Sequence, residues 1–237
     1  MDLSTLITLQ FIAHLFTDYF LQSDKQAKEK NKLGFKSKFL SVHFIIALLT
    51  SWILSFQVQF VFVALIIAIS HIIIDGIKKH IHSNKIIGRY AFYIDQILHI
   101  SVFTIASIIF DKYSTLYPFY GVTIEWKYTL IAAGYLLCLK PANILIKQIF
   151  NSSGIVIQRD ADLEKAGRLI GSLERILTLT FVILGEFEAV GFLIAAKSIL
   201  RFKDGDTKKT EYVLIGTMLS FVIAIGIGII VLKLINT

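Results

Sequence analysis

Apolar runs long enough to cross a lipid bilayer follow one another along most of the chain. A helix needs about 20 apolar residues to span the hydrocarbon core. No alternation with a period of two persists long enough to predict a membrane barrel. The pattern predicts an all-α, polytopic transmembrane helical bundle with about seven to eight membrane helices. The expected spans are 3–22, 38–56, 58–78, 91–110, 127–148, 169–185, 188–201 and 211–233.

Two of these runs, 169–185 and 188–201, are shorter than the rest and meet near Glu186. They predict either a tight helical hairpin or a re-entrant pair. No internal repeat or linker divides the chain. We expect a single integrated membrane domain, with a four-helix unit at 1–110 and further membrane helices at 111–237.

Composition excludes a soluble globular protein. Hydrophobic residues make up 55% of the chain and charged residues only 17%, whereas soluble domains carry about 25% charged residues. The only cysteine, Cys138, cannot form an internal disulfide, and we expect it to be a small apolar packing residue. Asp2 stands where a cleaved signal peptide has its basic segment, so the first run is predicted to remain as a membrane helix.

The net charge of +7 comes from lysines and arginines that lie between the apolar runs. No basic stripe with interleaved aromatic residues predicts a nucleic-acid partner. Loops rich in cations alternate with loops poor in them, and cation-rich loops stay in the cytoplasm. The N-terminus is therefore expected outside and, with eight crossings, the C-terminus also. Membrane lipids are the expected partners, and the oligomeric state is left open.

Three of the spans carry a histidine and an aspartate four residues apart, which places both on one helix face. The order is reversed in the span that runs outward, so all three carboxylates are expected about 6 Å to the cytoplasmic side of the imidazoles. A further histidine, His43, lies at a similar depth in the second span. The three pairs are His14 with Asp18, His71 with Asp75, and His99 with Asp95.

Ionisable residues inside a bilayer are costly and usually face the bundle interior. Imidazoles and carboxylates converging there suit Zn²⁺, or Mn²⁺ or Fe²⁺ where carboxylates dominate, and six ligands also suffice for two ions. The alternative is a set of His–Asp hydrogen bonds between helices. The expected metal ligands are His14, His43, His71, Asp75 and His99.

The first functional hypothesis is a metal-dependent hydrolase that acts on a lipid or amphipathic substrate at the cytoplasmic leaflet. A bound ion lowers the pKa of its water to about 7, and Asp18 or Asp95 is expected to act as general base. Gln22 and Gln96 are expected to orient a substrate oxygen. A metal-ion or proton transporter or channel that uses the same residues, or a non-catalytic membrane partner, remains the alternative.

A second group of polar residues lies in the C-terminal half. Glu174 is expected to pair with Lys197 or Arg201. The alternative is an anion clamp in which these residues and Lys140 bind a phosphate headgroup. Pro141 is expected to kink the fifth span and free a backbone carbonyl.

The combination H-x3-D-[YF]-x-L-Q, L-S-V-H, H-x3-D-x2-K and D-Q-x2-H resembles an uncharacterised bacterial integral-membrane family of unknown function, DUF3307, over roughly residues 5–110. The resemblance implies a multi-pass protein of the bacterial cytoplasmic (inner) membrane, and it implies no activity. The layout also resembles, more loosely, membrane-bound metal-dependent hydrolases. The matching residues are His14, Asp18, Leu21, Gln22, His43, His71, Asp75, Lys78, Asp95, Gln96 and His99.

Overall fold

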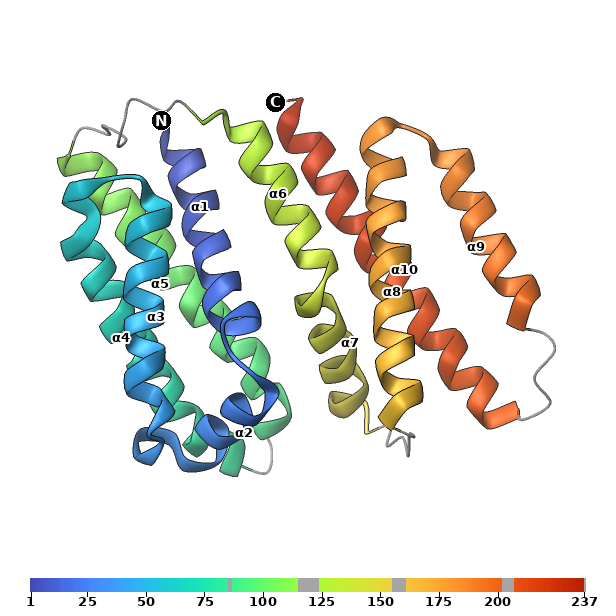
Figure 1. Ribbon diagram of the computed structural model, residues 1–237, viewed down its shortest axis with the longest axis horizontal. Helices are drawn as coiled ribbons and strands as arrows, with labels where there is room; N and C mark the ends of the chain where they lie inside the picture. Colours follow the sequence, from blue (N-terminus) through green and yellow to red (C-terminus); the bar gives the residue numbers. More distant parts are fainter. Residues whose placement is uncertain (85–86, 115–123, 155–160, 202–206, 237) are drawn as a thin grey trace. The chain divides into compact units, whose positions relative to one another are not determined.

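The computed structural model describes residues 1–84, 87–114, 124–154, 161–201 and 207–236 (Figure 1). These residues form helices and contain no strand, so the predicted all-α fold is confirmed for them. The chain divides into two compact units, Met1–Ala133 and Gly134–Thr237.

The N-terminal unit is a bundle in which α1, α3, α4 and α5 lie side by side (Figure 1). Helix α4 contacts both α3 and α5, and α1 contacts α3 and α5. A short turn joins α3 to α4, and the segment that contains α2 joins α1 to α3. Its elements are α1 (Leu3–Leu15), η1 (Phe16–Phe20), α2 (Asp24–Leu33), η2 (Gly34–Lys36), α3 (Phe39–Ser55), η3 (Val58–Phe60), α4 (Val61–Ser83), η4 (Gly88–Tyr90) and α5 (Ala91–Tyr113).

An apolar core closes one end of this bundle, around the start of α1, the start of α4 and the end of α5. The rings of Phe60 and Phe110 meet edge to face, with centroids 5.0 Å apart. The buried histidines and aspartates lie beyond this core, in the other half of the bundle. The core residues are Leu6, Phe60, Ala64, Ile67, Phe103 and Phe110.

The first predicted span, 3–22, is not a continuous α-helix. Helix α1 has 13 residues and continues as a five-residue π-helical turn, Phe16–Phe20. The backbone N–H of Leu21 donates to the carbonyl of Phe16, a spacing of five residues. Such turns are rare and frequently lie at functional sites, and this one carries Asp18.

Helix α2 forms in the segment that was predicted to be only a cationic loop. Ser23 and Gln26 cap its first turn reciprocally. Helices α2 and α3 are bent by 107° relative to each other. The Phe35 ring packs on Gly76 of α4 so closely that a Cβ added at Gly76 would lie 2.2 Å from the ring. This contact holds the α2 segment against α4 beside Asp75.

In the C-terminal unit, the expected kink at Pro141 is present. Helix α6 (Trp126–Cys138) meets helix α7 (Lys140–Ser152) at an angle of 49°. The boundary between the two units lies within α6. Pro141 lies in the first turn of α7, where its missing N–H costs nothing.

Helices α8 (Ala161–Leu184) and α9 (Phe187–Arg201) form a helical hairpin with Gly185 at its turn (Figure 1). Helix α8 begins eight residues before the predicted run, which started at residue 169. The last helix, α10 (Thr207–Ile235), packs closely on α8, because a Cβ added at Gly228 would lie 2.5 Å from Val182.

Within the described residues, three helical segments are long and apolar enough to cross a membrane, or up to five if each bent pair counts as one span. The predicted seven to eight crossings are not confirmed by these lengths. Helix α1, with 13 residues, and α9, with 15, are both shorter than the roughly 20 residues that a span needs. The segments that qualify singly are Val58–Ser83, Gly88–Tyr113 and Val213–Ile235.

Candidate metal centre

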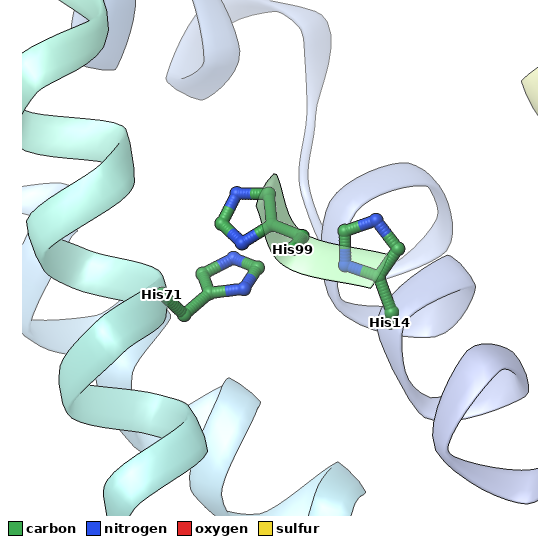
Figure 2. A group of neighbouring side chains, drawn as sticks. All are labelled: His14, His71 and His99. Carbon is green, nitrogen blue, oxygen red and sulfur yellow. The ribbon is translucent and has the colours of Figure 1, made fainter. Parts of the chain in front are cut away.

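Five helical elements of the N-terminal unit bring the histidines and aspartates into one buried cluster. His14 lies in the last turn of α1, Asp18 in the π-helical turn and His43 in α3. Helix α4 supplies His71 and Asp75, and α5 supplies Asp95 and His99. None of the seven side chains is more than 8% exposed. Figure 2 shows the imidazoles of His14, His71 and His99 converging from three separate elements.

Four of these residues form a close tetrad. His43 Nε2 lies 3.1 Å from Asp18 Oδ1, 3.0 Å from His71 Nε2 and 3.2 Å from Asp75 Oδ2. His71 Nε2 lies 3.2 Å from Asp18 Oδ1 and 3.6 Å from Asp75 Oδ2. A neutral imidazole nitrogen carries one proton or one lone pair, so it makes a single hydrogen bond. Hydrogen bonding therefore explains only part of this convergence.

The spacing of the tetrad matches the coordination of a small divalent ion. Zn²⁺ binds nitrogen and oxygen ligands at about 2.0–2.2 Å in a tetrahedron, which places neighbouring ligand atoms about 3.3 Å apart. The five distances given for the tetrad range from 3.0 to 3.6 Å. Two imidazoles and two carboxylates are a suitable donor set for Zn²⁺, and also for Mn²⁺ or Fe²⁺.

Two further groups of ligand atoms adjoin the tetrad. Within each group, the ligand atoms all lie within 4.8 Å of one another. The first group is His14, His71 and His99, and it shares His71 with the tetrad. The second group is Asp18, Asp95 and His99, and it shares Asp18 with the tetrad. The rings of His71 and His99 are stacked, with centroids 4.0 Å apart. The predicted ligands His14 and His99 therefore lie beside the tetrad, and Asp18, predicted as a base, lies within it.

A cavity of about 20 Å³ adjoins the three-histidine group, on the side away from Asp75. That volume holds about one water molecule. Its polar lining includes Thr17 and Thr50, whose hydroxyls are 2.8 Å apart. It also includes Gln10 and Ser51, which exchange two hydrogen bonds.

Gln96 lies among the ligands, as the spacing D-Q-x2-H places it. Its Oε1 accepts a hydrogen bond from the Tyr19 hydroxyl and lies 3.1 Å from His14 Nε2. Its Nε2 donates to Asp95. The other predicted substrate-orienting residue, Gln22, is buried and donates to the backbone carbonyl of Asp18. Both amides therefore contact residues of the cluster.

Two buried lysines that were not predicted as site residues contact the cluster. Lys30 Nζ lies 2.6 Å from Asp75 Oδ2 and 2.9 Å from His43 Nε2. Lys78 Nζ lies 2.7 Å from Asp95 Oδ2. Lys78 follows Asp75 by three residues, and this spacing places it on the ligand-bearing face of α4. No comparable signal marks Lys30, because its helix was expected to be a loop.

The residues predicted to form a substrate clamp lie in the C-terminal unit. Glu174 forms an ion pair with Lys197, which is the simpler of the two alternatives considered for it. The side chain of Arg201 lies outside the described side chains. Lys140 begins α7.

The buried polar centre of the C-terminal unit is Arg175, which is 1% exposed. Its Nε donates to the carbonyl of Cys138 at the end of α6, at 2.7 Å. Its other nitrogens donate to Ser220 and to Asn143. Arg175 thus caps a carbonyl freed by the helix break. Cys138 is fully buried, as predicted.

The fold and the cluster define the class: a helical protein with membrane-length helices and a buried histidine–aspartate centre. A family model described as "Protein of unknown function (DUF3307)" matches residues 6–124, and the chain belongs to this family. The family resemblance read from the sequence is thus confirmed. No curated protein and no solved structure matches the chain.

Proposed function

We propose that this protein is a metal-dependent membrane hydrolase that acts on a lipid or amphipathic substrate near the cytoplasmic leaflet of a bacterial inner membrane. Asp18, His43, His71 and Asp75 are the proposed ligands of a Zn²⁺ ion, with Mn²⁺ or Fe²⁺ as alternatives. The observation that carries the proposal is the position of His43 Nε2. It lies within 3.2 Å of one carboxylate oxygen from each of Asp18 and Asp75 and of His71 Nε2.

A divalent ion held by these four ligands would need a fifth coordination position for water, and would then supply a water of lowered pKa at neutral pH. Asp95 is the proposed general base, because its Oδ1 has no hydrogen-bond partner among the described residues. Its other oxygen accepts from Lys78 and Gln96, which fix its orientation. In the hydrolysis, oxygen from water bonds to the substrate carbonyl or phosphoryl centre, the ester bond breaks, and Asp95 passes the proton to the leaving oxygen.

The surface of α2 and η2 supports a substrate at the membrane interface. Exposed lysines on this segment would attract anionic headgroups, each contributing about 1 kcal/mol near a charged membrane surface. The Phe35 ring is 57% exposed there. We include in the proposal the seven to eight crossings and the outside N-terminus, which place this segment in the cytoplasm. The exposed lysines are Lys25, Lys28, Lys32, Lys36 and Lys38.

The test combines metal content and hydrolysis. The full chain is purified in detergent, treated with EDTA and reloaded with Zn²⁺. It is then assayed against micellar p-nitrophenyl acyl and phosphate esters and a bacterial lipid extract. We expect bound zinc and a hydrolytic activity that EDTA removes. The variant with both His43→Ala and His71→Ala should lose both, and the control His82→Ala, exposed at the end of α4, should keep both. Zinc binding that is equal in the double variant and the wild type would end the metal proposal.

One observation favours a second function, the passage of an ion or proton. The hydrogen-bonded pairs Gln10–Ser51, which is buried, and Thr17–Thr50, which is partly buried, extend the polar region from the histidines toward the apolar end of the bundle. A polar route of this kind suits a transporter or channel. Zinc or proton flux into proteoliposomes, with no turnover of any ester, would favour this reading. If the folded wild-type protein binds no metal, carries no flux and turns over no ester, the remaining alternative is a non-catalytic membrane partner.

A further inference from the structure

A second set of ligand atoms lies next to the tetrad, and two of its buried atoms have no hydrogen-bond partner among the described residues. The set consists of Asp18, Asp95 and His99, whose ligand atoms all lie within 4.8 Å of one another. Asp95 is 1% exposed and His99 is 3% exposed. The three residues come from two separate elements, the π-helical turn and α5. Their convergence is therefore a feature of the tertiary fold.

Two atoms of this set face each other without a hydrogen bond. His99 Nε2 and Asp95 Oδ1 are 3.6 Å apart, and neither has a hydrogen-bond partner among the described residues. Buried polar atoms are almost always paired, so each exception requires an explanation. A cation placed between a lone pair on Nε2 and the carboxylate oxygen would satisfy both atoms at once.

Asp18 connects this set to the tetrad. Its Oδ1 lies 3.1 Å from His43 Nε2 and 3.2 Å from His71 Nε2, so that oxygen faces the tetrad. Its Oδ2 lies 3.9 Å from His14 Nε2, on another side of the carboxylate. A carboxylate that belongs to two adjacent ligand sets is suited to bridge two ions, which in two-metal hydrolases lie about 3.5–4 Å apart.

The two buried lysines, Lys30 and Lys78, also contact one ligand set each. Lys30 contacts Asp75 of the tetrad, and Lys78 contacts Asp95 of the second set. Each position thus has a carboxylate that already binds a cation through Oδ2. The three-histidine group does not define a third position, because it shares His71 with the tetrad and His99 with the second set.

We infer that the centre holds two divalent ions, one in the tetrad and one on Asp95 and His99, with Asp18 as the bridging ligand. This inference rests on the proposed metal-dependent function and deepens it. Two-ion centres stabilise both the attacking and the leaving oxygen of a displacement. In the two-ion centre Asp95 Oδ1 is therefore a ligand of the second ion and no longer acts as the general base; the second ion would bind the oxygen of the reacting group.

The experiment counts ions in the full chain. Detergent-purified protein is stripped with EDTA, dialysed against excess Zn²⁺, freed of unbound zinc and analysed by elemental mass spectrometry. We expect two zinc ions per chain in the wild type and in the control His82→Ala. His99→Ala should retain one ion, in the tetrad, and His43→Ala should retain one ion, at the second position. Monodisperse elution and an unchanged helical circular dichroism spectrum establish that each variant is folded.

A second measurement needs no variant. The wild type loaded with Mn²⁺ should show the electron paramagnetic resonance spectrum of an exchange-coupled pair. One ion per chain, unchanged in His99→Ala, or an uncoupled Mn²⁺ spectrum, would overturn the two-ion centre and leave a single-ion hydrolase intact. A wild type that binds no ion would overturn the proposed function itself, so the two failures are distinguishable.

Discussion

Lys30 Nζ lies 2.6 Å from Asp75 Oδ2, although α2 joins the bundle only at its surface. The two side chains are 3% and 1% exposed. The ammonium also lies 2.9 Å from His43 Nε2, so it contacts the same ligand atoms that a metal ion would use. Lys30 and a metal ion are therefore expected to compete for this side of the tetrad.

Replacing Lys30 by methionine tests that competition. Removing one partner of a buried ion pair typically costs about 3–5 kcal/mol, because the other charge stays buried. We expect Lys30→Met to lower the thermal stability of the metal-free protein. Zn²⁺ should stabilise the variant more than the wild type, since no ammonium has to be displaced. Differential scanning fluorimetry in detergent, with and without Zn²⁺, measures both effects. Lys28→Met, exposed on the same helix, is the control, and an equal zinc-induced shift in all three proteins would contradict the expectation.

The contact between Phe35 and Gly76 predicts a paired effect. A methyl group at Gly76 would overlap the Phe35 ring, and overpacking typically costs about 1–3 kcal/mol. We expect Gly76→Ala to lower the free energy of unfolding by that amount. Adding Phe35→Ala removes the ring and should restore most of the loss. Denaturant unfolding followed by circular dichroism gives the values, and a fully additive double variant would show that the ring is not the cause.

Arg175 predicts a defect confined to the C-terminal unit. Arg175→Met leaves the Cys138 carbonyl and the Asn143 and Ser220 side chains without this donor. Each buried unsatisfied group costs about 1–3 kcal/mol. Arg175→Lys should rescue little, because an ammonium does not reproduce the planar fork of donors.

Thermal unfolding of the two Arg175 variants measures this loss. Zinc content should stay at the wild-type value, because every proposed ligand lies within Met1–Ala133. Wild-type melting of Arg175→Met would show that the break between α6 and α7 needs no cap.

The orientation is testable with single cysteines. Cys138→Ser removes the only native thiol, and single cysteines are then placed at Lys25, Ser114 and Asn236. With an outside N-terminus and eight crossings, an impermeant maleimide should label positions 114 and 236 in intact cells. Position 25 should be labelled only after permeabilisation. If positions 114 and 236 are labelled from opposite sides of the membrane, the number of crossings between them is odd. If position 25 alone is labelled in intact cells, the orientation is the reverse of the predicted one.

The convergence of the cluster could be read from the sequence because helix geometry is regular. Residues four apart share a face, so His71 with Asp75 and Asp95 with His99 were placed correctly on α4 and α5. The reversed order in α5 matches its antiparallel course (Figure 1). The buried position of His43 was also expected, from its depth in the second span.

The features that the sequence did not predict are departures from regular α-helix geometry or contacts made only in the tertiary fold. The π-helical turn changes the direction of Asp18, and its five residues carry no pattern that distinguishes them from an α-helix. Lys30 enters the site because a surface helix folds back on α4, a tertiary event that periodicity does not encode. The helix lengths do not confirm the seven to eight crossings, because that number took each apolar run as one span, whereas α1 and α9 are each shorter than the roughly 20 residues that a span needs.

The boundary between the two units at Ala133 separates all of the proposed ligands from the C-terminal unit. Every proposed ligand and both buried lysines lie between His14 and His99, inside the stretch that the family model matches. A recombination that exchanged everything after Ala133 would transmit all of the proposed ligands together. Chimaeras joined at this point should therefore keep the metal content of the protein that supplies residues 1–133.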